Sequence, residues 1–157
     1  MYRIRIRLLA HVCFGVLLAG SASGEPASGA VQVRAIAEIE TGAKLAPAKR
    51  VVSGDRVLYT LEIRNAGATT APPPLVDYPI PAHTWYVGDS AVGPGGEILF
   101  SVDGGLSFDR PENLRVAGPN GDLRAAVATE YTHIRWQLKN SLKANSVAFV
   151  RFRVLVK

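Results

Sequence analysis

The chain has 157 residues, of which 48% are hydrophobic and 20% are charged, the proportions of an ordinary globular protein. Its 15 glycines and 10 prolines separate short apolar runs, which favours an all-β fold with frequent turns over a helical one. The formal net charge is +5, yet residues 25–157 carry 15 basic and 13 acidic side chains, a net charge of +2. These charges are interspersed, which argues against a nucleic-acid-binding protein.

The first 24 residues have the three parts of a secretory signal peptide. Residues 2–7 (YRIRIR) are basic, residues 8–20 form an apolar run of 13 residues, and small residues follow at 21–24. A span across a bilayer takes about 20 apolar residues, so an uncleaved membrane anchor is the weaker alternative. Cleavage before Glu25, or after Ala22, predicts an exported protein of the periplasm, cell surface or extracellular space, with no membrane span in the mature chain.

Cys13 is the only cysteine, and it lies inside the apolar run after Val12. A lipid-attachment signal needs a cysteine directly after that run and behind a small residue, so lipidation is not expected. The mature chain would then contain no cysteine. It would have to be stable without a disulfide, and it could perform no thiol chemistry.

A short polar lead, residues 25–30, precedes one domain at residues 31–157, in which apolar residues recur with a period of two. Asp103-Gly104 predicts a hairpin turn, and residues 41–49 are predicted to be a loop. The expected strands together imply two packed antiparallel sheets of about seven to nine strands. They cover residues 31–40, 57–64, 75–77, 84–87, 97–102, 106–108, 131–138 and 147–156.

Several blocks of this domain, in their order along the chain, resemble a known family. The run Val52–Gly67 (VSGDRVLYTLEIRNAG), the pairs Val76-Asp77 and Ile80-Pro81, and the last two strands resemble the bacterial conserved-repeat domain, domain of unknown function eleven. The resemblance spans about residues 31–157 and implies an immunoglobulin-like β-sandwich in a cell-envelope protein. It implies no reaction. Family members often form long arrays, whereas this sequence holds one unit, so a stalk role is not expected.

The block Gly88-Asp89-Ser90-Ala91 is similar to the nucleophile block of one class of hydrolases. That block belongs to an α/β fold with a partner Asp and His near the C-terminus, and this chain is predicted to be all-β and lacks that pair. His83 and His133 have no metal-ligand spacing to other residues. We therefore expect no catalytic residue, no metal ligand and no enzymatic activity.

Five aspartates fall in predicted loops or turns, and two or three of them could converge on Ca²⁺. Turn formation explains them equally well, and no calcium-loop motif is present. We expect no cofactor, with Ca²⁺ as the alternative. The five are Asp77, Asp89, Asp103, Asp109 and Asp122.

Five residues are predicted to contact a partner. Trp85 and Tyr86 are aromatic residues near a strand end, and such residues are favoured at binding hot spots. Val147, Phe149 and Arg151 share the outward face of the last strand, which is unusually apolar for a solvent-facing surface.

These features favour a non-catalytic structural or binding module of the envelope, whose partner is another envelope protein or a second copy. Two alternatives stay open. One is a periplasmic accessory or chaperone-like subunit that presents an edge strand to an assembly system. The other is a calcium-binding or hydrolytic protein.

Overall fold

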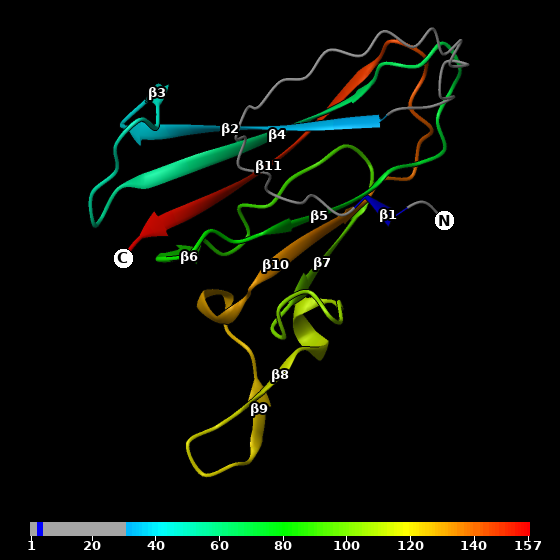
Figure 1. The fold of residues 1–157 in the computed structure, drawn as a ribbon. Helices are drawn as coiled ribbons and strands as arrows, with labels where there is room; N and C mark the ends of the chain where they lie inside the picture. Colours follow the sequence, from blue (N-terminus) through cyan, green and yellow to red (C-terminus); the bar gives the residue numbers. More distant parts are fainter. Residues whose placement is uncertain (1–2, 5–30) are drawn as a thin grey trace, which may run out of the picture.

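The computed structural model describes residues 3–4 and 31–157, and this part of the chain is all-β, as predicted. Its only helical turns are two short 3₁₀ segments, η1 (Pro111–Asn113) and η2 (Ala128–Glu130). The strands form two main sheets that lie in separate layers, with a small hairpin extending away from both (Figure 1). Within the described residues, no helix has the length and apolar character needed to span a membrane.

The larger sheet has the strand order β3-β2-β4-β11-β6. Its central strands are β4 (Arg56–Asn65) and β11 (Val147–Val156), which pair antiparallel from Val147 opposite Arg64 to Leu155 opposite Arg56. β2 (Val31–Thr41) lies on the other side of β4, and the short β3 (Lys44–Pro47) pairs with the end of β2. β6 (Thr84–Tyr86) pairs with only the last residues of β11.

The smaller sheet has β10 (His133–Gln137) at its centre, between β5 (Leu75–Pro79) and β7 (Glu97–Ser101), both antiparallel to it. The two-residue strand β1 (Arg3–Ile4) adds to β5 in parallel. The predicted signal peptide otherwise lies outside the described residues. Cleavage at residue 24 would remove β1 and leave β5 as the sheet edge.

The hydrophobic core lies between the two sheets and is built from the faces that the period-two pattern predicted. Leu61 and Ile63 of β4, Phe152 of β11, and Ile134 and Trp136 of β10 are fully or almost fully buried. The rings of Trp136 and Phe152 lie 5.9 Å apart and join the layers. The alternation is confirmed for the inner residues of β4, β10 and β11, because each second side chain of these strands enters the core.

The predicted strand at residues 106–108 does not form, although the chain reverses at Asp103-Gly104 and Asp109 pairs with Phe100 in a single antiparallel bridge. The Asp103 carboxylate instead accepts hydrogen bonds from the backbone N–H groups of Leu106 and Ser107 and from the hydroxyl groups of Ser101 and Ser107. These bonds hold the pKa of Asp103 well below its ordinary range. The carboxylate folds the segment into a closed loop, which β-hairpin sequence rules do not anticipate.

A two-stranded hairpin forms later, between β8 (Arg115–Ala117) and β9 (Leu123–Ala125). With β3 and β1 it raises the number of described strands to eleven, against the seven to nine expected. β3 lies inside the segment 41–49 that was predicted to be a loop. These additional strands are two to four residues long, too short for periodicity to identify them.

Candidate functional site

Three of the five predicted contact residues, Val147, Phe149 and Arg151, come together at one groove. It has a volume of about 540 Å³ and runs along the first half of β11. Phe149 is 47% exposed there, and Arg151 is exposed beside it. We call this feature the edge groove, and its lining consists of Val92, Gly93, Pro94, Val147, Ala148, Phe149 and Arg151.

The edge groove exists because the chain changes sheets at this point. Val92 exchanges two backbone hydrogen bonds with Arg151, 2.8 and 2.9 Å long, and so lies beside β11. Pro94 has no N–H to continue this pairing, and Gly95 has a φ of 56°, which turns the chain away. Gly96 then packs against the carbonyl of Gln137 in β10, where a side chain would have no room. The chain continues into β7, so β11 loses its neighbour.

Among the described residues, the first part of β11, at Val147 and Phe149, consequently has no backbone partner on the side away from β4. β4 pairs with β11 over residues 147–155, but among the described residues β6 pairs only with residues 154–156. Arg151 and Arg153 direct their N–H and C=O groups away from β4, toward Val92 and the 87–90 turn. Because these directions alternate along a strand, Val147 and Phe149 direct theirs to the same side. There they border the edge groove.

Trp85 and Tyr86 do not belong to this groove. Trp85 pairs with Leu155, six residues along β11 from Phe149, which places it about 20 Å away on the same face. It is 40% exposed, and the Lys157 ammonium lies 5.3 Å from its ring centroid. Tyr86, by contrast, is 3% exposed and belongs to the core, because adjacent residues of a strand face opposite ways.

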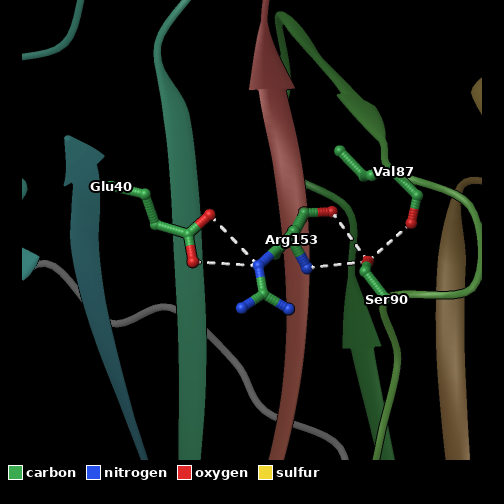
Figure 2. Close-up of polar contacts among 4 residues, drawn as sticks. All are labelled: Glu40, Val87, Ser90 and Arg153. Atoms are coloured by element: carbon green, nitrogen blue, oxygen red, sulfur yellow. Dashed lines mark hydrogen bonds and ion pairs between the residues drawn. The ribbon is translucent and has the colours of Figure 1, made fainter. Parts of the chain in front are cut away.

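Ser90, the candidate nucleophile of the 88–91 block, is engaged in structural hydrogen bonds (Figure 2). Its Oγ donates to the Val87 carbonyl at 2.5 Å and accepts from the Arg153 N–H at 3.0 Å. The residue is 8% exposed. Beyond the end of β6, the Ser90 hydroxyl thus pairs with the Arg153 backbone that a neighbouring strand would otherwise pair with. Among the described residues, no histidine contacts this hydroxyl.

Figure 2 also shows the Arg153 side chain reaching Glu40. The Nε atom lies 2.9 and 3.1 Å from the two carboxylate oxygens, an ion pair between β11 and β2 that spans β4. The Arg153 side chain therefore joins β11 to β2 across β4 on the outer face of the larger sheet, while its backbone N–H is held by Ser90. Both interactions stabilise the sheet and leave the edge groove free.

Three of the five loop aspartates are engaged in separate contacts within the chain. No group of three His, Cys, Asp or Glu residues that could hold a metal ion occurs in the described part of the chain. Asp77 forms a bidentate pair with Arg135, at 2.6 and 2.7 Å, on the outer face of the smaller sheet. Asp103 closes its own loop, and Asp109 accepts hydrogen bonds from Arg110 and Asn113.

Two residues important to the edge groove, Val92 and Pro94, were not among the predicted contacts. The Pro94-Gly95-Gly96 run indicates a chain reversal. It does not reveal which strand loses its partner, because that depends on the order of strands in the sheet. The chain has no significant match to any family model, curated protein or solved structure.

Proposed function

We propose that the protein is a non-catalytic binding module of the bacterial cell envelope, which receives an extended segment of another envelope protein on the open edge of β11. The observation that carries the proposal is the coincidence of unpaired backbone at Val147 and Phe149 with an apolar groove beside it. Strand addition uses both features: main-chain hydrogen bonds supply affinity, and side-chain contacts in the groove supply specificity.

Charge indicates the chemistry of the added segment. Among the described residues, Arg151 is the only charged one that lines the edge groove, and it takes part in none of their ion pairs. An added strand with apolar side chains toward Val92 and Phe149 and an acidic side chain near Arg151 complements this surface. A basic segment would be repelled.

The proposed fold is a variant of the immunoglobulin-like sandwich of the conserved-repeat class. Seven strands, β2, β4, β5, β6, β7, β10 and β11, correspond in sequence order to A to G. Constant-type immunoglobulin domains arrange these as ABED and CFG, whereas this chain has ABGD and CFE. The fifth and seventh strands have exchanged places, so the C-terminal strand lies next to β4.

Contacts within the family-like run also support this assignment. Asp55 accepts a hydrogen bond from the Val52 N–H at 2.8 Å, which closes the turn before β4. Asn65 accepts one from the Gly67 N–H at 3.0 Å, which closes the turn after it. Neither Asn65 nor Gly67 has a positive φ. The motif acts through side-chain hydrogen bonds.

Site-specific photo-crosslinking tests the function. A photoreactive phenylalanine analogue replaces Phe149 in the full chain, expressed in the organism of origin, and the same analogue replaces Leu45 as the control. Leu45 is 49% exposed and lies on β3, at the other side of the larger sheet. The proposal predicts one major adduct with another envelope protein from position 149 and none from position 45.

A second variant ties the adduct to strand addition. Val147→Pro removes an N–H group that points away from β4, so the pairing of β4 with β11 is retained while the open edge loses a donor. The adduct should fall at least about tenfold in this variant and persist in Val147→Ala. An unchanged adduct in Val147→Pro, or identical adducts from both positions, would contradict the proposal. An adduct with a second copy of the chain would replace it with self-association.

The same open edge favours a second candidate function, an accessory or chaperone-like subunit that offers β11 to a component of an assembly system. The crosslinked protein distinguishes the two. A stable adduct with a mature envelope protein supports the binding module, and a transient adduct with an unassembled subunit supports the accessory role.

A further inference from the structure

A second cavity, remote from the edge groove, lies where the turn between β6 and β7 approaches η2. It has a volume of about 270 Å³. Its walls include three aromatic rings, from Tyr86, Phe100 and Tyr131, whose centroids lie 4.6 to 5.9 Å apart. Ile98 adds an aliphatic wall, and Asp89 also lines the cavity. We call this cavity the tyrosine pocket.

Asp89 is held there in an uncommon backbone conformation. It has a φ of 57°, and the turn is closed by hydrogen bonds from Ser90 to the Val87 carbonyl. Gly88, which would adopt a positive φ without strain, precedes it and has no positive φ. The turn therefore places an aspartate where glycine or asparagine would be favoured. Asp89 takes part in none of the ion pairs of the described residues.

Acidic side chains lie close to the tyrosines of the pocket. Burial raises the pKa of the Tyr131 hydroxyl, and the charges of Asp89 and Glu112 raise it further. Burial likewise raises the pKa of Tyr86, hydrogen bonds with Ala91 and Ser90 lower it, and Asp89 adds the smallest increase. Arg110, the nearby cation on the approach to η1, is held by Glu97 at 2.6 Å. Both hydroxyl groups therefore stay protonated at neutral pH, and among the described residues no cation pairs with the Asp89 carboxylate beside them.

We propose that the tyrosine pocket binds an alkylammonium group, with Asp89 as the counter-ion and the partly exposed ring of Tyr131 as the cation–π partner, while the buried Tyr86 ring forms the floor. Aromatic rings attract organic cations through the negative charge of their faces, and a carboxylate at the mouth adds a direct ion pair. A bare metal ion fits less well, since it would find one carboxylate among aromatic and aliphatic walls. This site is independent of the proposed strand addition at β11.

The test titrates the full chain, labelled with ¹⁵N, and follows backbone amide shifts. The probes are choline, n-butylammonium and 3,3-dimethylbutan-1-ol, the neutral isostere of choline. We expect millimolar binding of at least one cation, with shifts centred on residues 86–91 and 128–131, and no saturable binding of the neutral alcohol. Preference for choline would indicate a quaternary ammonium ligand. Preference for n-butylammonium would indicate a primary amine such as a lysine side chain.

Two variants locate the site. Asp89→Asn removes the charge and keeps a residue that tolerates the left-handed conformation, so it should fold and weaken cation binding by about tenfold. Tyr131→Leu should weaken cation binding by about fivefold. It tests the site independently if Asp89→Asn does not fold. Asp122→Asn, at an exposed turn, is the matched control and should change nothing. No cation binding up to about 50 mM, equal binding of the alcohol, or full binding by Asp89→Asn would overturn the proposal.

Discussion

Asn65 at the end of β4 provides the sharpest stability prediction, because its buried side chain joins three segments. The Nδ2 group donates to the carbonyls of Thr69 at 2.7 Å, Leu142 at 2.9 Å and Lys143 at 3.2 Å. Its Oδ1 accepts from Gly67, and the residue is fully buried. Replacement by alanine would leave several buried groups unsatisfied. We expect Asn65→Ala to lower the free energy of unfolding by about 3 kcal/mol.

Asn65→Asp is nearly isosteric and should be worse, by more than about 4 kcal/mol at pH 7, because a carboxylate would face three carbonyl oxygens. Burial would raise the pKa of the new carboxyl, so the folded state would bind more protons than the unfolded state. Stability should therefore recover partly as the pH falls toward about 4, relative to the unchanged protein.

Urea unfolding followed by circular dichroism measures both effects. Asn120→Asp makes the same chemical change at an exposed turn and should alter stability by less than about 0.5 kcal/mol. Equal stabilities for Asn65→Asp and Asn120→Asp at pH 7 would refute the reasoning.

Two further predictions follow from packing and charge. A Cβ at Gly93 would lie 3.1 Å from the Trp136 ring, so Gly93→Ala should lower the free energy of unfolding by about 2 kcal/mol. A Cβ at Gly88 would make only an ordinary contact, so Gly88→Ala should lower it by less than about 0.5 kcal/mol. Urea unfolding measures both variants, and the reverse order would contradict the prediction. The Arg124 guanidinium and a backbone N–H hold the pKa of Glu130 at about 2, below the ordinary 4.5. The contribution of this pair to stability should be complete above about pH 4.5 and lost as the pH falls toward 2. Arg124→Ala should raise the pKa of Glu130 in an NMR titration. An unchanged pKa in that variant would exclude the ion pair as the cause of the lowered pKa.

The sequence predicted the long strands well because each has one buried face. In β11, the apolar residues Val150, Phe152 and Val154 recur at every second position, and all three are buried. The same rule could not place Trp85 and Tyr86, since two adjacent aromatic residues satisfy either choice of inner face. Only the pairing of Trp85 with Leu155 and the packing of Tyr86 in the core decide between them.

The edge groove could be predicted only in part. Its strand residues, Val147, Phe149 and Arg151, were identified because the outward face of β11 is too apolar for solvent alone. The opposite wall depends on the chain leaving β11 after Val92, and that follows from the tertiary arrangement of the two sheets. The tyrosine pocket has no sequence signature, because its residues come from four separate segments of the chain.

Amide hydrogen exchange of β11 tests the central claim most directly. The Arg151 N–H is bonded to the Val92 carbonyl at 2.9 Å, whereas the N–H groups of Val147 and Phe149 face the open edge. In the free protein, the Val147 and Phe149 amides should exchange at least about a hundredfold faster than that of Arg151, and they should become protected when the crosslinked partner is bound. Protection of Val147 and Phe149 equal to that of Arg151 in the free protein, or no gain on binding, would contradict strand addition at this edge.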